Sequence, residues 1–329
     1  MADIIDNTYI ANKLKELANY YLDLNENYRA QTFNYAASLV SKFPVPITDP
    51  YTQLKGVPKI GPGTLKRIYE IVTTGQLEEI QNQPPPEINQ YDVIKQELST
   101  VHGIGPATAE NFIQQGVTGL NDLITKYNEG KIKLTQNQVI GLTYYNDFQQ
   151  RIPREEVALV GESIIGILKQ LDPLNLGEIV GSYRRGKSFS GDIDILITHP
   201  ENKNYLQILV NYLVENGLIL HVLSLGPVKF QGVYNSGYPD NNGVMRKIDI
   251  RFIPHSSYFT GILHGTGSGE HNVLLRQRAL EKNMTLSEHG LYNLDPKTKQ
   301  RLDQIPVNSE EEIFNILGLE YVPPEQRDL

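Results

Sequence analysis

The chain has 329 residues, 40% of them hydrophobic and 21% charged, and its 30 Lys and Arg oppose 38 Asp and Glu for a net charge of −8. This length favours several small lobes, because cores rarely grow as one unit at this size. The absence of cysteine excludes disulfides, thiolate nucleophiles and cysteine-bound zinc or iron–sulfur clusters, so any metal must bind oxygen or histidine. No apolar run reaches the roughly 18 residues of a membrane span, and the acidic N-terminus is unlike a secretion signal. We therefore expect a soluble, intracellular protein.

The N-terminal third of the chain is predicted to be helical. Apolar residues fall at three- and four-residue steps over residues 9–24, as on one face of a helix, and a second stripe starts at Phe33 and stops before the prolines at 44 and 46. The proline run within 83–87 suits neither a helix nor an inner strand. We interpret it as a linker.

A different pattern begins beyond residue 150. A helix is predicted after Arg154, and from Gly177 onward strands alternate with helices: strands over 192–197 and 247–252, and helices over 205–214 and 270–282. The acidic run at 310–312 is typical of the first turn of a helix. The predicted fold class is multi-domain, with helical N-terminal domains followed by an α+β part.

A Gly-rich motif occurs twice in the helical part. VPKIGPGT at 57–64 is echoed by VHGIGPAT at 101–108, and each copy places Gly-Pro at the start of a helix. Glycine permits a close approach of the backbone, and free N–H groups at a helix start can face an anion. Two copies suit a phosphate backbone contacted without reading its sequence, through Gly61, Gly63, Gly103 and Gly105. The alternative is a pair of ordinary helix connections.

This repeat resembles the helix-hairpin-helix motif, in which hairpin carbonyls can hold a monovalent cation. The resemblance implies candidate Na⁺ or K⁺ ligands among the carbonyls of Lys55, Val57, Ile60, Ser99, Val101 and Ile104.

Residues 181–194, GSYRRGKSFSGDID, carry the strongest chemical signal. Three cations, hydroxyls and glycines precede the first acid, as a polyphosphate cradle requires. Asp192 and Asp194 share one face of a strand, because strand side chains alternate, and Asp249 on the later strand supplies a third carboxylate. Three carboxylates can bridge two magnesium ions roughly 3.5–4 Å apart and support phosphoryl transfer. The alternative is a pair of solvated aspartates on an edge strand, unrelated to Asp249.

The Gly-Ser…Asp-x-Asp pattern is similar to the nucleotidyltransferase superfamily, and alone it does not separate DNA polymerases from enzymes that modify RNA tails or antibiotics. The full order of motifs resembles family X of the DNA polymerases, most closely its polymerase-beta-type members. The resemblance implies four parts: a lyase-type domain with the first hairpin over 1–83, a second DNA-binding hairpin subdomain over 84–150, a nucleotidyltransferase palm over 151–260, and a nucleotide-selecting subdomain over 261–329.

The implied function is template-directed addition of deoxynucleotides to a primer 3′-hydroxyl, filling short gaps in base excision repair. It implies two Mg²⁺ ions, for which Mn²⁺ can substitute, gapped or primer–template DNA and dNTPs as partners, a monomer, and a location in the nucleus or another site of DNA repair. Two alternatives stay open: a template-independent terminal transferase, and a non-catalytic scaffold that binds DNA ends.

The resemblance also assigns individual residues. Asp192, Asp194 and Asp249 match the catalytic metal ligands, with Asp249 placed to activate the primer hydroxyl. The positions that contact the incoming nucleotide are Arg151, Ser182, Arg185, Gly191, Gly267 and Asn272. Template or DNA contacts are expected at Lys229, Arg251 and Arg276, and Glu288 matches an acid that pairs with an arginine on closure.

Two departures from the family pattern are visible. His264 and Gly265 replace the aromatic pair before Thr-Gly-Ser, so selection of the sugar is expected to differ. The position of the lyase nucleophile is Arg67, which cannot deprotonate to form a Schiff base. Lys66 lies about 100° further round the helix. Other positions of that pocket read Arg29, Gly63 and Glu79, so the resemblance does not carry lyase activity over, and Lys66 is the remaining candidate amine.

Overall fold

The computed structural model describes residues 5–24, 26–41, 43, 45–54, 57, 60–81, 90–237 and 243–328. The expected linker at 83–87, the candidate cation ligand Lys55 and part of the first hairpin motif lie outside these residues. The chain divides into two units, Met1–Thr100 with Ile104–Lys133, and Val101–Gly103 with Leu134–Leu329. Each unit is considered by itself.

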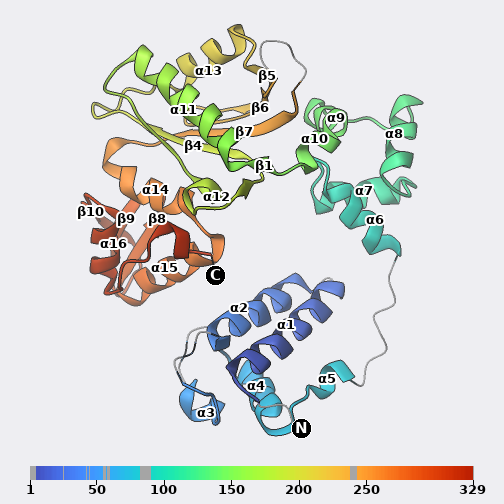
Figure 1. Cartoon of the computed structure of the whole chain (residues 1–329), viewed down its shortest axis with the longest axis vertical. Coiled ribbons are helices and arrows are strands. Elements are labelled where there is room, and N and C mark those ends of the chain that lie inside the picture. The colour runs from blue at the N-terminus through green and yellow to red at the C-terminus, as the bar shows by residue number, and fades with distance from the viewer. Residues whose placement is uncertain are drawn as a thin grey trace. The chain divides into compact units, whose positions relative to one another are not determined.

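The first helices of the first unit form a small core of their own. Helices α1 (Asn7–Asp23) and α2 (Asn27–Ser41) pack side by side, and α3 (Pro50–Gln53), α4 (Pro62–Thr74) and α5 (Glu78–Gln81) follow (Figure 1). Asp6 caps α1 by accepting a hydrogen bond from the Tyr9 N–H at 2.7 Å. The predicted stripes are buried, which confirms them: Ile10, Leu14, Leu17, Ala18 and Tyr21 in α1, and Phe33, Ala36, Ala37 and Val40 in α2.

The second hairpin lies between α6 (Gln90–Ser99) and α7 (Pro106–Gln114), and α8 (Leu120–Asn128) completes this part. The residues before α4 and α7 have nearly the same backbone conformation: Gly61 has φ −81° and ψ 172°, and Gly105 has φ −84° and ψ 172°. Both helices start at the proline, so the predicted Gly-Pro helix starts are confirmed.

The second unit opens with α9 (Gln136–Thr143) and α10 (Tyr145–Gln149). Within this unit, Gly141 brings the backbone of α9 against that of His102. A Cβ added at Gly141 would lie 2.2 Å from the His102 carbonyl oxygen, so only glycine allows this approach.

A mixed five-stranded sheet forms the centre of the second unit. Its order is β2 (Leu176–Ile179), β4 (Ile193–Thr198), β7 (Met245–Phe252), β6 (Lys229–Asn235) and β5 (Ile219–Leu225), and β4 and β7 run parallel. A short antiparallel pair, β1 (Ile152–Pro153) and β3 (Phe189–Ser190), lies outside it.

The two faces of this sheet carry different side chains. Helices α11 (Arg154–Leu171) and α13 (Leu206–Glu215) cover one face, onto which Ile248, Ile250 and Phe252 project from β7 (Figure 1). Lys247, Asp249 and Arg251, at the alternate positions of β7, are less buried and belong to the other face. Beside that face lie α12 (Gly181–Arg184) and α14 (Tyr258–Thr266).

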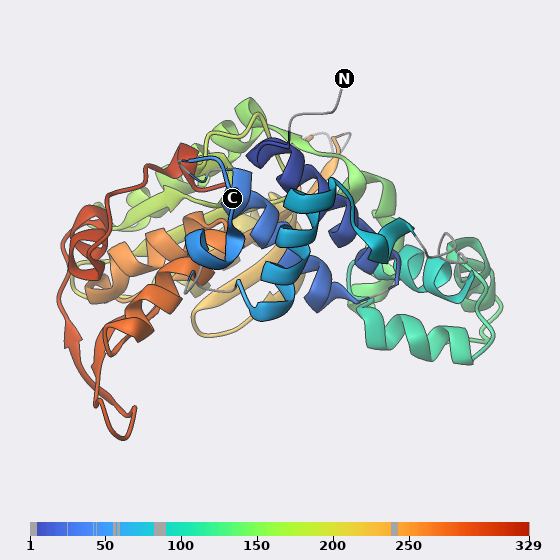
Figure 2. The same ribbon diagram turned by 90° about the horizontal axis from the view of Figure 1, so that it is seen from below.

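The C-terminal part has its own core around Leu291 and Phe314. It contains η1 (His255–Ser257), α14, α15 (Gly269–Glu281), the sheet β10-β9-β8, α16 (Glu310–Leu317) and η2 (Pro324–Gln326), with strands β8 (Met284–Ser287), β9 (Gly290–Leu294) and β10 (Arg301–Ile305). Figure 2 shows the β9–β10 hairpin extending away from the helices. The predicted fold class, helical first and α+β afterwards, is confirmed.

Candidate active site

The three predicted acids lie on or directly before β4 and β7, two neighbouring strands inside the sheet. Asp194 is the register partner of Asp249 across the parallel pair, and Asp192 immediately precedes β4. The sheet therefore brings Asp194 and Asp249 together on one face, because paired residues of neighbouring strands project in the same direction.

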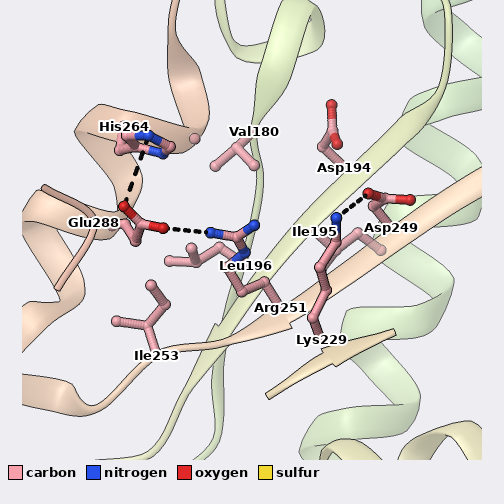
Figure 3. A pocket seen from close by; sticks show the side chains of 12 residues that line it. Val180, Asp194, Ile195, Leu196, Lys229, Asp249, Arg251, Ile253, His264 and Glu288 are labelled. Carbon is pink, nitrogen blue, oxygen red and sulfur yellow. Dashed lines mark hydrogen bonds and ion pairs between the residues drawn. The ribbon is translucent and has the colours of Figure 1, made fainter. Parts of the chain in front are cut away.

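Asp249 has two polar partners on the neighbouring strand β6. Its carboxylate accepts hydrogen bonds from the Gln231 Nε2 at 2.9 and 3.2 Å, and it lies 3.3 Å from the Lys229 Nζ (Figure 3). Lys229, predicted to contact the template, is thus an ion-pair partner of a predicted catalytic acid. Gln231 was not among the residues predicted from the sequence, although it lies two positions beyond Lys229 and so shares its face of the strand.

The acids lie in a region of excess negative charge. Burial, together with the negative charges of Asp192 and Asp249, raises the pKa of Asp194 to about 7. Burial is also the main cause that raises the pKa of Asp192, with Asp249 adding to it, while Lys247 and Arg151 oppose the shift. A divalent cation would relieve this repulsion, and carboxylate oxygens are the ligands that magnesium prefers.

Carboxylate oxygens are suitable ligands for such an ion, but the aspartate side chains do not converge on one point in this structure. In the described part of the chain, no group of three or more histidine, aspartate or glutamate side chains is gathered as ligands of one metal ion. Asp249 is turned instead towards Lys229 and Gln231.

The backbone of the basic turn passes close to Asp194. Gly181 has φ +64°, and a Cβ there would lie 2.3 Å from the Asp194 Oδ2, so the position requires glycine. The next residue, Ser182, donates its hydroxyl to the Ser190 Oγ at 2.8 Å. This contact ties the start of the turn to its end.

The short β1–β3 pair brings Arg151 to the same place. Ile152 is the partner of Ser190, and a Cβ at Gly191 would lie 3.8 Å from the Arg151 Nη1. Arg151, Ser182 and Gly191, which are far apart in sequence, are therefore neighbours.

Arg185 connects this turn to the C-terminal part. Its Nη1 donates to the Thr266 carbonyl at 2.6 Å, and its Nε donates to the Asp328 Oδ1 at 2.8 Å. A Cβ at Gly267 would lie 3.2 Å from the Arg185 Nη1. The structure thus brings Arg185 and Gly267 together, and it adds Asp328, which the sequence analysis did not identify.

The remaining predicted nucleotide contact, Asn272, is hydrogen-bonded both to His264 and to the predicted template contact Arg276. The Asn272 Nδ2 donates to the His264 carbonyl at 2.8 Å, and the Arg276 Nε donates to the Asn272 carbonyl at 3.2 Å. Burial lowers the pKa of His264, although Glu288 opposes the shift.

A cavity of about 230 Å³ lies between the acids and α14. Arg251 donates to Glu288 at 3.0 Å across it, and the His264 Nε2 lies 3.8 Å from the same carboxylate (Figure 3). Glu288 therefore pairs with an arginine, as the resemblance implied. The lining residues are Val180, Asp194, Ile195, Leu196, Lys229, Asp249, Arg251, Ile253, Gly261, His264, Gly265 and Glu288.

The predicted lyase position is occupied by an ion pair. The Arg67 Nε and Nη2 donate to Glu79 at 2.6 and 2.8 Å, the Tyr21 hydroxyl donates to the same carboxylate, and the guanidinium lies 5.2 Å from the centre of the Phe33 ring. The neighbouring Lys66 is exposed. Of the candidate cation ligands, the Val57 carbonyl accepts a hydrogen bond from the Ile60 N–H at 3.1 Å.

Family models cover nearly the whole of this architecture. Residues 151–255 match the DNA polymerase beta palm and residues 261–328 the DNA polymerase beta thumb. Residues 96–149 match the fingers domain of DNA polymerase lambda. Residues 5–77 match a helix-hairpin-helix domain and 51–115 a SAM-like helix-hairpin-helix tandem. The chain belongs to family X of the DNA polymerases.

Two curated proteins show how this family X chain relates to longer members. DNA polymerase lambda of Rattus norvegicus is 30% identical over 98% of this chain and 56% of its own length. DNA polymerase lambda of Arabidopsis thaliana is 30% identical over 95% of this chain and 60% of its own length. The chain thus spans little more than half the length of these relatives. Among its described residues, no helix is both long enough and apolar enough to cross a membrane.

Proposed function

We propose that the chain is a DNA-directed DNA polymerase that adds deoxynucleotides to a primer 3′-hydroxyl. The observation that carries this proposal is the pairing of Asp194 with Asp249 across two parallel strands. Asp192 lies directly before the first of these strands and follows a basic turn in the sequence. Carboxylates beside a cationic cradle suit transfer of a nucleotidyl group from a triphosphate. The names of the two relatives support the same reaction.

Each residue of the site has a proposed part in this reaction. Asp192, Asp194 and Asp249 would hold two divalent metal ions, which when bound stabilise the attacking and leaving oxygens of phosphoryl transfer. Asp249 accepts the proton of the primer hydroxyl, and Lys229 and Gln231 fix its carboxylate beforehand.

Nucleotide binding is assigned to the residues gathered around the basic turn. Arg151, Ser182 and Arg185 bind the triphosphate through charge-assisted and neutral hydrogen bonds, and the backbones of Gly191 and Gly267 allow it to approach closely. Asn272 contacts the base or sugar edge, while its side chain keeps the His264 carbonyl in place.

DNA binding is assigned to the hairpin motifs and to the open face of the sheet. Gly61, Gly63, Gly103 and Gly105 let backbone N–H groups contact phosphates without reading sequence. Arg276 and Lys229 contact the template. Arg251 joins them only after it leaves Glu288, because the two side chains are paired here.

The proposal also covers the cellular role of the protein, its oligomeric state and its domain limits. We assign short-gap filling in base excision repair, a monomeric enzyme that works in the nucleus or at another site of DNA repair, and the domain limits 1–83, 84–150, 151–260 and 261–329. A Na⁺ or K⁺ ion at the hairpins belongs to the same proposal. The ion pair between Arg67 and Glu79 argues against lyase activity.

One assay separates this function from its alternatives. The protein is incubated with a one-nucleotide-gapped duplex, Mg²⁺ and single labelled deoxynucleotides. Insertion of the templated nucleotide alone supports the polymerase, and we expect it to be faster on the gap than on a long single-stranded template. Addition of any nucleotide to a single strand would instead indicate a terminal transferase. Binding of the gapped duplex without insertion would indicate a scaffold.

A further inference from the structure

The C-terminal segment is anchored through Arg327 beside the Thr-Gly-Ser sequence at 266–268. This side chain is fully buried, its Nη1 donates to the Glu310 Oε1 at 2.6 Å, and its Nε donates to the Val322 carbonyl at 2.9 Å. The Arg327 carbonyl in turn accepts the Ser268 hydroxyl at 2.7 Å. These bonds fix the backbone immediately before Asp328.

From this anchor, the Asp328 carboxylate bridges two cations of the basic turn. Its Oδ1 lies 2.8 Å from the Arg185 Nε, and its Oδ2 lies 2.7 Å from the Lys187 Nζ. The side chain of Arg185 is 16% exposed and that of Lys187 is 49% exposed. The better-buried contact, to Arg185, is therefore the one less weakened by solvent.

Asp328 and Thr266 together fix the plane of the Arg185 guanidinium. Nε is held by Asp328 and Nη1 by the Thr266 carbonyl, and among the described residues Nη2 has no hydrogen-bond partner. A guanidinium is planar, so two anchors define where its remaining N–H groups point. Orientation before binding lowers the entropy lost when a ligand is captured.

The carboxylate is charged at neutral pH. Burial opposes its ionisation, but the hydrogen bonds from Lys187 and Arg185 outweigh burial and hold the pKa of Asp328 below its usual value. Asp328, Arg185 and Lys187 together keep a net charge of about +1, so this cluster of three side chains still attracts a triphosphate.

We propose that Asp328 is a positioning residue for nucleotide binding, which holds Arg185 ready for the incoming triphosphate. This inference rests on the proposed function. The role falls to a residue at the end of the thumb that is 143 positions from Arg185 in the sequence.

The test compares Asp328→Asn, which keeps the shape and removes the charge, with Asp328→Glu, which keeps the charge. Glu320→Gln is the matched control, because it removes an exposed carboxylate from the same C-terminal segment. Single-turnover insertion into gapped DNA gives the apparent Kd of the nucleotide and the maximal rate separately. DNA affinity and Tm are measured on the same samples.

For Asp328→Asn we expect the apparent Kd of the nucleotide to rise about tenfold, with the maximal rate within about threefold of wild type. DNA affinity and Tm should stay unchanged, and Asp328→Glu should recover most of the nucleotide affinity. Lys187→Gln should weaken nucleotide binding less than Asp328→Asn, because Lys187 is the more exposed partner.

Three results would overturn the inference. Unchanged nucleotide affinity in Asp328→Asn would show that Arg185 needs no anchor. Tighter binding would show that the carboxylate competes with the triphosphate. An equal loss in Lys187→Gln would transfer the effect to Lys187. If the wild-type protein inserts no nucleotide at all, the proposed function fails instead, so the two failures are distinguishable.

Discussion

Gly265 leaves open a space that an aromatic side chain would fill, and we predict that the enzyme therefore discriminates weakly against ribonucleotides. Gly265 lies in α14 and, with His264, lines the cavity of about 230 Å³. A Cβ added there would lie 3.3 Å from the Cγ2 of Val180, which lines the same cavity. The variant that tests this prediction is Gly265→Phe.

The structure indicates that the variant can fold. The contact with Val180 is tight by a few tenths of an ångström, and such overpacking costs on the order of 1 kcal/mol. Replacing glycine within a helix returns roughly 0.5 kcal/mol. The His264 carbonyl could itself crowd the 2′ position of the sugar. It is held by Asn272, so it should contribute equally to ribonucleotide discrimination in wild type and in Gly265→Phe.

A new clash with a 2′-hydroxyl is worth about 1.4–3 kcal/mol, or roughly 10- to 150-fold in rate. We expect Gly265→Phe to raise the preference for a deoxynucleotide over its ribonucleotide by that order. The assay is the ratio of the two kcat/KM values on one gapped substrate. Gly166→Phe is the matched control, because it changes a glycine of α11 that faces open space. A folded, DNA-binding Gly265→Phe whose ratio equals that of wild type would show that Gly265 does not control the choice of sugar, as would ten-thousandfold discrimination by wild type.

Two further predictions concern Asp194 and the lyase position. The raised pKa of Asp194, about 7, means that the folded, metal-free protein retains a proton that the unfolded chain releases above its ordinary pKa of 3.8, so stability falls as pH rises through this window. In EDTA at pH 8, Asp194→Asn should therefore have a larger free energy of unfolding in urea than wild type, by at most about 4 kcal/mol. Equal stability at pH 5 and pH 8 in both proteins would contradict this. Borohydride should trap little adduct between wild type and a 5′-deoxyribose phosphate end. The amount of trapped adduct should rise in Arg67→Lys, and most when Glu79→Gln also removes the carboxylate that would keep the lysine charged. Efficient trapping by wild type would point to Lys66.

Much of the fold could be predicted from local periodicity. The stripe of α1 and the alternation in β7 need only the repeat of a helix or a strand and the preference of apolar side chains for the core. The acids followed from the same alternation, which places Asp249 opposite Ile248 and Ile250. The assignment of the three acids as metal ligands came from the resemblance to family X and not from this alternation alone.

The long-range ion pairs could not be predicted in this way. Asp328 and Arg185 are 143 positions apart, and Glu310 and Arg184 are 126 apart. The acidic run at 310–312 does begin a helix, but Glu310 is buried between Arg184 and Arg327 as well as lying in its first turn. Such pairs depend on how the thumb packs on the palm, which no local pattern encodes.

The assignment of the catalytic acids is tested by a substitution that removes one of them and leaves DNA binding intact. Single-nucleotide insertion into gapped DNA is compared for wild type, Asp249→Ala and the control Asp303→Ala, which changes an exposed aspartate of β10. We predict that Asp249→Ala abolishes insertion, because a metal ligand and the acceptor of the primer proton are both lost, while its affinity for gapped DNA stays within about threefold. Asp303→Ala should behave as wild type. An Asp249→Ala protein that retains a tenth of normal turnover would contradict the assignment of the catalytic site.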